Sequence, residues 1–403
     1  MGGVARAARW RYLTSDSVGA AEGLATDEAL MAGFGREATS AYAAALRLYT
    51  YRPHCALVGR YQSVADEVDL EFCAAHGVEV GRRPTGGGAI IMGSGQLGVA
   101  ICARARADEP PRDALRGYAD GVIAGLAALG VEAQFRSKND LEVGGKKIAG
   151  LGLHLDSHGG LLFHASVLVG LDVELMLRIL RIPGAKVADK GVSKVADRIT
   201  TLERELGTST TAAEVRECFA AGLARAFDAD LVADTLTEAE ESLNAQRVES
   251  RYANPEWTFE RSARSDTTGS ALLKTPEGLL RIHAGLHGEM IKSILLAGDF
   301  NTLPPGVARL ERALKWCRAD RQTIGEMVAG SRAPEELGVA AEAIADVIFK
   351  ATLSARRRNS YPRRTAGSCY FPESGSTGPT RSSALTEPPE PSELSQRTEE
   401  MPS

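Results

Sequence analysis

The stretch KIAGLGLHLDSHGGLLFHASVLV, residues 147–169, predicts a long β-hairpin. Two runs rich in apolar residues, KIAGLGLHLD and LLFHASVLVG, flank the turn SHGG, and this order is typical of two antiparallel strands. Gly150 and Gly152 leave two positions of the first strand without a side chain, and a lysine stands at its start. The hairpin therefore combines a sheet signal with the small residues and the cation that a binding cleft needs.

Strand and helix signals alternate on both sides of this hairpin. Short apolar runs predict strands at 11–16, 46–51, 55–60 and, hinged on glycines, within 89–103. Amphipathic spacing predicts helices at 23–34 and 112–129, and Gly130 ends the second of them. Two Thr-x-x-Glu capping boxes, Thr200 with Glu203 and Thr211 with Glu214, predict two more helix starts.

Composition and charge limit the functional classes to which the chain can belong. The chain has 403 residues, of which 44% are hydrophobic and 25% are charged, and this suits two domains or one domain with appendages. A net charge of -5 argues against non-specific nucleic-acid binding. No apolar run resembles a secretory signal or a membrane span. The six cysteines form no C-x-x-C pair, so we expect reduced thiols in a cytoplasmic protein.

Three parts of the chain are expected. Residues 1–252 mix strands and helices in a catalytic domain. Residues 253–353 hold a three-strand meander at 270–275, 278–286 and 288–299, followed by helices at 306–317 and 335–352, and form a small α+β domain. Residues 354–403 are rich in Ser, Pro, Thr, Arg and Glu, and we expect a disordered, solvated tail; its arginines offer the alternative of an acidic partner.

The run GRRPTGGG, residues 81–88, is the first candidate for a ligand site. Arg82 and Arg83 offer forked donors that match phosphate or carboxylate oxygens, and Thr85 adds a hydroxyl. Gly86, Gly87 and Gly88 carry no Cβ, so the chain can touch a ligand and direct amides at it. The spacing is not that of a Walker loop. A plain surface turn with exposed arginines is the alternative.

A second candidate, SKNDLEVGGKKIAGLG, spans residues 137–152. Asn139 and Asp140 begin a strand, two glycines make the turn, and Lys146 and Lys147 lead into the hairpin. A lysine at the start of a glycine-spaced strand can point its ammonium into a cleft, where the exclusion of water strengthens its attraction for an anion. The alternative is a surface hairpin with two solvated lysines.

Four motifs in this order resemble a known family. GRRPTGGGAI, KNDLEVGGKKIAGLGLH, LLFHASVLVGLD and KGVSKVADRITTL are similar to the lipoate–protein ligase branch of the biotin/lipoate ligase fold, and TSDSVGAAEGLATDEALM and CALVGRYQSV match its opening elements. The resemblance covers residues 9–206 and extends more weakly into the meander, which resembles the accessory C-terminal domain of bacterial ligases. It implies an α/β (α+β) fold with a largely antiparallel central sheet flanked by helices.

The resemblance also implies a reaction in two steps. Lipoate or octanoate attacks the α-phosphorus of ATP to give an acyl-adenylate, and a lysine of a lipoyl domain then takes the acyl group. Lys147 would be the catalytic lysine. The lipoyl-AMP contacts would come from the residues Arg82, Arg83, Thr85, Gly86, Gly87, Gly88 and His164. The nucleotide contacts would come from Asn139, Asp140 and Lys190, with Asp140 also binding Mg²⁺.

Partners and alternatives follow from the same resemblance. The acceptors would be lipoyl domains of 2-oxoacid dehydrogenases or the glycine cleavage H protein, and the enzyme would be a cytoplasmic monomer that needs neither nucleic acid nor membrane. His164 is equally well explained as a satisfied hairpin histidine. Met92 stands where family members usually carry a histidine, which bears on the choice of acyl chain.

Related enzymes of this fold transfer octanoyl groups through a cysteine thioester without ATP. No cysteine occurs between Cys102 and Cys218, so the hairpin lacks that nucleophile and the ligase is favoured. A cysteine-independent or atypical octanoyltransferase, a biotin ligase and a non-catalytic lipoyl-binding protein are the remaining alternatives.

Overall fold

The structure is a computed structural model of the whole chain, and it describes residues 7–52, 54–136, 139–181, 195–263, 266–276 and 278–359. All of the described residues belong to one compact unit. Most of the expected tail, from residue 360 onward, lies outside the described residues. In the part of the chain that is described, no helix is both long enough and apolar enough to span a membrane.

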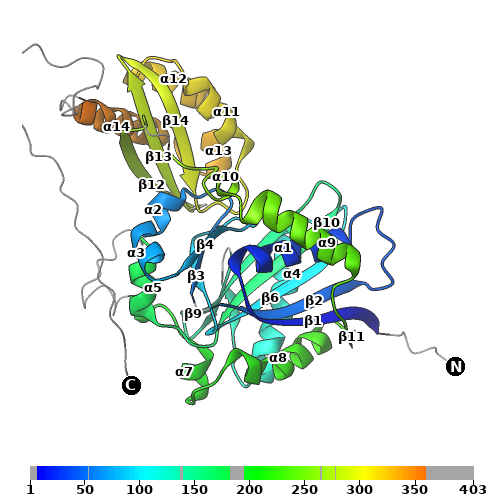
Figure 1. Ribbon diagram of the computed structural model, residues 1–403. Helices are drawn as coiled ribbons and strands as arrows, with labels where there is room; N and C mark the ends of the chain where they lie inside the picture. The colour runs from blue at the N-terminus through cyan, green and yellow to red at the C-terminus, as the bar shows by residue number, and fades with distance from the viewer. Residues whose placement is uncertain are drawn as a thin grey trace, which may run out of the picture. The chain divides into compact units, whose positions relative to one another are not determined.

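An eight-stranded sheet is the centre of the part of the chain that precedes residue 253 (Figure 1). Its strands, in spatial order, are β11 (Ala229–Ala233), β1 (Ala8–Val18), β2 (Ala44–Tyr51), β6 (Gln96–Arg104), β10 (Gly160–Leu168), β9 (Lys146–Leu155), β8 (Asp140–Val143) and β7 (Gln134–Arg136). Strand β10 pairs antiparallel with both β6 and β9, and the parallel pairs in this sheet are those of β1 with β11 and with β2. The predicted hairpin and the largely antiparallel central sheet are confirmed.

Helices cover both faces of this sheet because successive side chains of a strand point to opposite faces. Leu46 and Leu48 of β2 pack with helices α4 (Pro111–Ala128) and α8 (Ala212–Ala226) in one hydrophobic cluster. Ala45 and Tyr49 of the same strand pack on the other face with helix α1 (Ala20–Ala32). Helix α9 (Glu238–Arg247) and the π-helical turn η1 (Val248–Tyr252) lie beside α1.

A second, three-stranded sheet carries the arginine and glycine motif. Its order is β4 (Glu79–Arg82), β3 (Cys55–Val58) and β5 (Ile90–Met92), so the segment between β4 and β5 crosses over β3. Short helices pack around it in their own hydrophobic cluster. They are α2 (Val64–Glu67), α3 (Leu70–Ala75) and α5 (Val173–Ile179).

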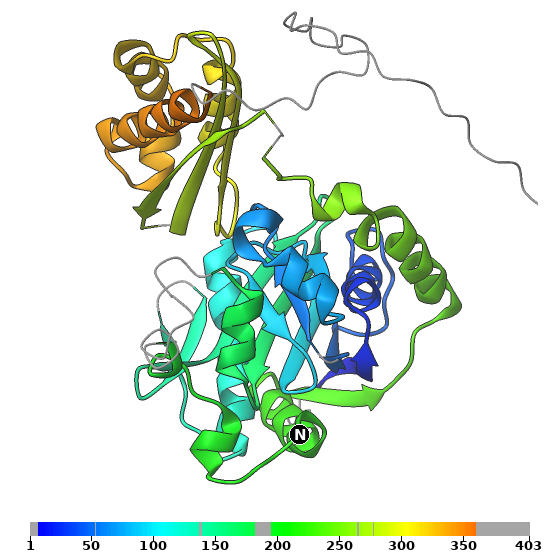
Figure 2. The same ribbon diagram turned by 60° about the vertical axis from the view of Figure 1, so that its left-hand side comes forward.

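The predicted meander forms a separate antiparallel sheet of β12 (Gly269–Thr275), β13 (Gly278–His287) and β14 (Met290–Gly298), and the short helix α10 (Pro255–Thr258) precedes it in the chain. Four helices lie on one face of it (Figure 2), and together they enclose their own core. They are α11 (Pro305–Leu314), α12 (Arg321–Ala329), α13 (Ala333–Leu337) and α14 (Ala341–Asn359). The boundary between residues 252 and 253 stays a prediction.

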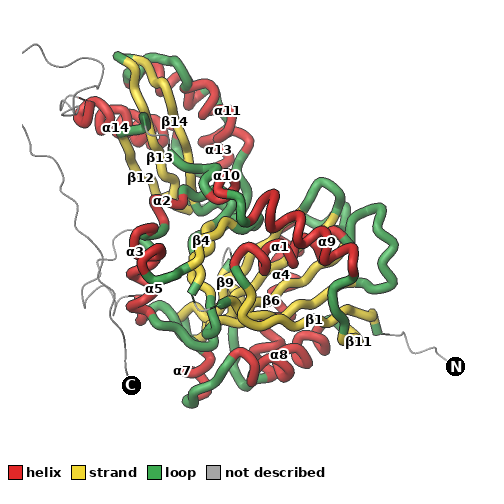
Figure 3. The backbone as a smooth tube through the Cα atoms, viewed as in Figure 1, coloured by secondary structure: helices red, strands yellow, loops and turns green. Residues whose placement is uncertain are grey.

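Several expected helix boundaries were wrong. The cap of α7 (Leu202–Leu206) is Thr201, which accepts from Arg204 N, and not Thr200; the Thr211–Glu214 capping box is confirmed. The expected helix at 335–352 is two helices, because Gly338 ends α13 in the left-handed region with φ 62°. Helix α14 continues past residue 353 to Asn359, because Ala355 is buried and cationic side chains suit a helix C-terminus. Figure 3 shows these helices in red.

Candidate functional site

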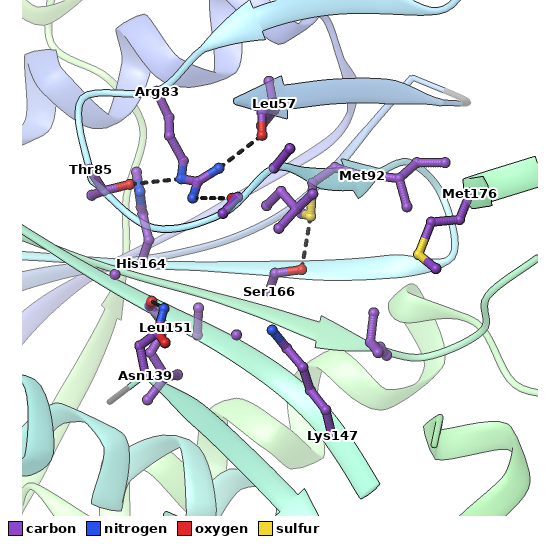
Figure 4. Close-up of a pocket in the computed structure, with 18 of the residues that line it drawn as sticks. Leu57, Arg83, Thr85, Met92, Asn139, Lys147, Leu151, His164, Ser166 and Met176 are labelled. Carbon is purple, nitrogen blue, oxygen red and sulfur yellow. Dashed lines mark hydrogen bonds between the residues drawn. The ribbon is translucent and has the colours of Figure 1, made fainter. Parts of the chain in front are cut away.

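A cavity of about 290 Å³ lies between the central sheet and the β4–β3–β5 sheet (Figure 4). Its walls come from helix α1, strands β2, β3, β5, β9 and β10, and the loop that follows β4. The lining residues are Leu24, Tyr49, Tyr51, Leu57, Arg83, Thr85, Gly88, Ala89, Ile90, Ile91, Met92, Asn139, Lys147, Gly150, Leu151, Gly152, His164, Ala165, Ser166, Leu168, Leu171, Met176, Leu180, Val195 and Ile199. A mainly apolar pocket with a few convergent polar groups is the usual form of a small-molecule site.

Lys147 is held by its backbone, while its ammonium stays accessible. Its N–H donates to Arg198 O at 2.9 Å, and its own carbonyl accepts from Thr200 N at 2.9 Å. The ammonium Nζ lies 2.7 Å from Asp140 Oδ1, and both side chains are 35% exposed. A Cβ on Gly150 would lie only 3.2 Å from Lys147 Nζ, so the glycine leaves room for the ammonium. The arrangement offers a cation to an anionic ligand.

Asn139 connects the lysine hairpin with the glycine loop. Its Nδ2 donates to Leu151 O at 3.2 Å, and its backbone carbonyl accepts from Leu151 N at 2.8 Å. A Cβ on Gly87 would lie 3.4 Å from Asn139 Nδ2. Asn139 lines the cavity, whereas Asp140 is not among the lining residues and reaches the site through its ion pair with Lys147.

Arg83 shapes the loop that follows β4. Its Nη2 donates to the carbonyls of Gly86 at 2.8 Å and Gly88 at 2.6 Å, and its Nη1 donates to Leu57 O at 2.8 Å. Its Nε donates to Thr85 Oγ1 at 3.1 Å. Burial lowers the pKa of this guanidinium to about 10. Arg83 lines the cavity, but its donors already bind protein oxygens, so its main effect is to fix the loop.

The glycine loop needs its glycines for close backbone contacts. Gly87 has φ 90°, and its N–H donates to Phe300 O at 2.8 Å. A Cβ on Gly86 would lie 2.1 Å from Phe300 O, and a Cβ on Gly59 would lie 2.0 Å from Gly87 O. Only Gly88 of the three lines the cavity. The expected row of free loop amides is therefore not observed at Gly87.

Arg82 has a different position from the one predicted. It is fully buried, and it is not among the residues that line the cavity. Its three guanidinium nitrogens donate to backbone carbonyls of residues in two separate segments: Gly59, Arg60, Gln62, Trp257 and Thr258. Burial lowers its pKa to about 10. The predicted contact of Arg82 with an acyl-adenylate finds no support in this geometry, because strand alternation sends Arg82 away from the cavity.

His164 belongs to a buried charge network. Its Nε2 lies 2.8 Å from Oδ2 of Asp27, a fully buried residue on α1. Arg47 Nη1 donates to Asp27 Oδ1 at 2.7 Å, and Tyr49 OH donates to Asp27 Oδ2 at 3.1 Å. Burial opposes the charged form, but the charge of Arg47 and the hydrogen bonds from His164 and Arg47 hold the pKa of Asp27 below its usual value. Asp27 is thus a carboxylate, and His164 Nε2 donates to it.

Sequence reasoning missed Asp27, Arg47 and the two tyrosines that line the cavity, Tyr49 and Tyr51. Asp27 stands on the apolar face of a helix, and Arg47 interrupts the apolar run LRLYTY. Two opposite charges in otherwise apolar elements were the available signal of a buried pair. Met92, singled out from the sequence, lines the cavity, and Ser166 Oγ donates to its sulfur at 3.0 Å.

Cysteines and metals give two further findings. Of the cysteines in the described ranges, Cys55, Cys73 and Cys102 are buried and none lines the cavity; Cys102 Sγ donates to Asp27 O at 3.5 Å. Among the described residues, no group of three or more His, Cys, Asp or Glu side chains could hold a metal ion. Lys190, a predicted nucleotide contact, lies outside the described residues.

Comparisons with known proteins identify the family to which this chain is similar. A family model of the lipoyl protein ligase A/B catalytic domain matches residues 19–224. The chain is 31% identical over 275 residues to octanoyltransferase LipM of Symbiobacterium thermophilum, covering 62% of this chain and 98% of LipM. It is 24% identical over 306 residues to lipoate-protein ligase LplJ of Bacillus subtilis, covering 75% of this chain and 90% of LplJ.

Solved structures extend the likeness. A bipartite lipoate protein ligase of Thermoplasma acidophilum, solved in a study that included its E2 lipoyl domain, has a TM-score of 0.57 and 27% identity, covering 64% of this chain and 99% of that chain. A putative lipoate protein ligase of the same organism with bound lipoic acid has a TM-score of 0.54 and 25% identity, covering 62% of this chain and 99% of that chain. A lipoate-protein ligase A bound with ATP has a TM-score of 0.54 and 26% identity, covering 62% of this chain and 98% of that chain.

Proposed function

We propose that this chain, which belongs to the lipoyl protein ligase A/B catalytic domain family, is an ATP-dependent lipoate–protein ligase. The family contains lipoate ligases and octanoyltransferases. The observation that carries the ligase assignment is the composition of the cavity: a one-third exposed ammonium, that of Lys147, reaches it, and no cysteine is among its described lining residues. This site can hold a carboxylate, but it offers no thiol to form a thioester.

In the first step, a carboxylate oxygen of lipoate or octanoate attacks the α-phosphorus of ATP and pyrophosphate leaves. Both reactants are anions, and negative charge gathers on the phosphoryl oxygens in the transition state. The ammonium of Lys147 can lie between them and offset that charge, which is the kind of electrostatic stabilisation that lowers a barrier most. Asp140 holds the ammonium in place until the ligand arrives.

In the second step, the amine of an acceptor lysine attacks the acyl carbon and AMP leaves. The acyl chain lies in the apolar part of the cavity, where water is excluded and cannot hydrolyse the mixed anhydride. Lys147 stays beside the carbonyl and the phosphate, so it stabilises the leaving AMP as well. Asn139 is fixed by Leu151 and lies next to Gly87, and we propose that it contacts the nucleotide.

Magnesium fits this site only together with nucleotide phosphates. Mg²⁺ is usually bound by one or two carboxylates and several phosphate or water oxygens. Asp140 supplies one carboxylate beside Lys147, and the described residues provide no cluster that would bind the ion alone. We propose Asp140 as its protein ligand, and an ion held there would neutralise phosphate charge.

The length of the match also supports a ligase. The match with LplJ covers 75% of this chain, against 62% for LipM, although LipM is the more similar in sequence. The acceptors that we propose are lipoyl domains of 2-oxoacid dehydrogenases or the glycine cleavage H protein, since one similar ligase was studied with an E2 lipoyl domain. We expect the enzyme to act in the cytoplasm as a monomer.

An octanoyltransferase that needs no cysteine is the second candidate, because of the 31% identity to LipM. Two assays on the full chain separate the candidates. A ligase catalyses lipoate- or octanoate-dependent exchange of labelled pyrophosphate into ATP, and it modifies a lipoyl domain only with ATP. A transferase modifies the same domain from octanoyl-acyl carrier protein without nucleotide, and that result would refute the ligase. A binder that is not an enzyme shows neither activity.

A further inference from the structure

Trp257, in the short helix α10, contacts the end of β4, where the glycine loop begins. Its indole Nε1 donates to Arg82 O at 2.8 Å. Arg83 N belongs to the same peptide group as Arg82 O, and it donates to Val58 O at 3.1 Å. Because a peptide group is planar, these two hydrogen bonds together set its orientation. That orientation decides the direction in which the Arg83 side chain leaves the backbone.

Arg83 carries this orientation into the cavity. Its guanidinium donates to the Leu57 carbonyl and to the Thr85 hydroxyl (Figure 4). It also donates to the carbonyls of Gly86 and Gly88. Arg83, Thr85 and Gly88 line the cavity. Because the loop is folded around this one side chain, a turn of the preceding peptide group would displace the loop residues that line the cavity.

Arg60 gives a second connection between the indole and the loop. Its N–H donates to Thr85 O at 3.0 Å, and its guanidinium carbon lies 4.4 Å from the centroid of the Trp257 ring. A cation over an aromatic face is attracted to it, so this pair holds its geometry. The guanidinium carbon of Arg251 also lies 4.4 Å from that centroid, and the Tyr252 ring stands edge-on at 6.0 Å. The indole therefore has a fixed position beside the loop.

We infer that Trp257 is a positioning residue for the ligand. It acts through the peptide group between Arg82 and Arg83, and through Arg60, to hold the loop in the shape that binds the acid. The inference rests on the proposed function for the identity of that acid. It goes further in giving a role in binding to a residue that is not among the described residues lining the cavity. The indole binds a backbone carbonyl, so its hydrogen bond can form whichever side chain stands at position 82.

The three tryptophans of the chain provide the test and its controls. Trp257→Phe keeps an aromatic ring but removes the indole N–H, so Arg82 O loses its donor. Trp10→Phe also removes an indole, but Trp10 is buried in the hydrophobic cluster on the other face of the central sheet, where it stacks on Phe227. Trp316→Phe changes a side chain that is 56% exposed.

The measurement is the affinity of each full-length variant for lipoate, by calorimetry without ATP, with chemical denaturation to give the folded fraction. Because one hydrogen bond that orients the loop is lost, Trp257→Phe should bind lipoate about tenfold more weakly per folded molecule. Trp10→Phe should unfold at a lower denaturant concentration and bind lipoate as the parent does. Trp316→Phe should change neither quantity. If Trp257 had a structural role alone, its variant would behave like Trp10→Phe.

Arg60→Met is a second variant, which decides the matter if Trp257→Phe does not fold. It keeps the backbone N–H that donates to Thr85 O, and it removes only the cation beside the ring and its exposed pair with Glu260. We expect its affinity for lipoate to be about two- to fivefold weaker than that of the parent.

Parental affinity in folded Trp257→Phe, or an equal loss of affinity in Trp10→Phe, would overturn the inference. A parent that does not bind lipoate would also overturn it, and so would parental affinity in Arg60→Met where Trp257→Phe does not fold. Failure of the proposed function is seen separately: the affinities would follow the expected order, but the parent would show no lipoate-dependent pyrophosphate exchange.

Discussion

The two cationic regions of the site are built in opposite ways. The guanidinium region, Arg82 and Arg83, is buried, and the guanidinium nitrogens of both side chains donate to protein oxygens, mostly backbone carbonyls. The ammonium region, Lys147, is one-third exposed and has one carboxylate partner. A buried fork of donors fixes the shape of the chain around it, whereas an accessible point charge can exchange its partner for a ligand. We therefore propose that the two arginines maintain the local fold and that Lys147 acts on the ligand.

The largest effect should follow from Lys147→Ala. Without the ammonium, the rate of lipoate adenylation should fall by at least about 10²–10³-fold, the effect of removing one well-placed donor to a developing anion. The unfolding free energy should change by less than about 1 kcal/mol, because both partners of the pair with Asp140 are one-third exposed and solvent screens their attraction. Pyrophosphate exchange and chemical denaturation measure the two quantities. Lys146→Ala is the control, since Lys146 is exposed and does not line the cavity.

Arg82→Met should lower the stability of the fold and leave ligand binding intact, which is the inverse of the effect expected for Lys147→Ala. It leaves five carbonyl groups of two segments without their donor, so the unfolding free energy should fall by about 3–5 kcal/mol. The loss should be visible as a lower denaturation midpoint, and lipoate affinity per folded molecule should be retained. A stable variant that has lost lipoate affinity would show that Arg82 binds ligand after all.

Gly86→Ala tests whether the glycine loop after β4, like the two arginines, maintains the packing of the fold. The added Cβ meets the carbonyls of Phe300 and Asn301 at 2.1 and 2.4 Å, so the loop or its neighbour has to shift. We expect a loss of about 1–3 kcal/mol in unfolding free energy, measured by denaturation. In Gly117→Ala the Cβ meets nothing within 4 Å on a helix, and the stability of this control should stay equal or rise. Equal losses in both variants would contradict the role given to loop packing.

The smallest effect should come from Cys102→Ala. Cys102 is buried, and burial raises the pKa of its thiol well above the usual value, so it is not poised as a nucleophile. Lipoyl-domain modification by the variant should stay within about twofold of the parent per folded molecule. Complete loss of modification by a folded variant would point to a thioester mechanism and away from the ligase.

Much of the fold could be predicted from the sequence because its strong patterns are local. The hairpin at 147–169 and the meander at 270–299 depend on alternation and turn residues, and both formed as expected. The end of α14 could not be placed, because the burial of Ala355 depends on tertiary packing and not on local composition. The helix α12 was missed for the same kind of reason: only a few of its residues face the core.

The candidate site was predicted in part. The motifs located Arg83, Thr85, Asn139, Lys147 and His164, and the structure brings all five to one cavity. Arg82 and Arg83 cannot be distinguished from the sequence alone, because only the strand geometry shows that Arg83 lines the cavity and Arg82 does not. Tyr51 and Asp27 were missed because each depends on contacts between elements distant in sequence. Whether the gathered residues bind lipoyl-AMP stays a prediction.

The division of roles between arginine and lysine can be tested in one measurement. Lipoate-dependent pyrophosphate exchange is compared between Lys147→Met and Arg82→Lys, each normalised to its folded fraction. We predict exchange below about 1% of the parent for the lysine variant and near-parental exchange for the arginine variant. A folded Arg82→Lys protein as inactive as Lys147→Met, or an active Lys147→Met protein, would contradict the account.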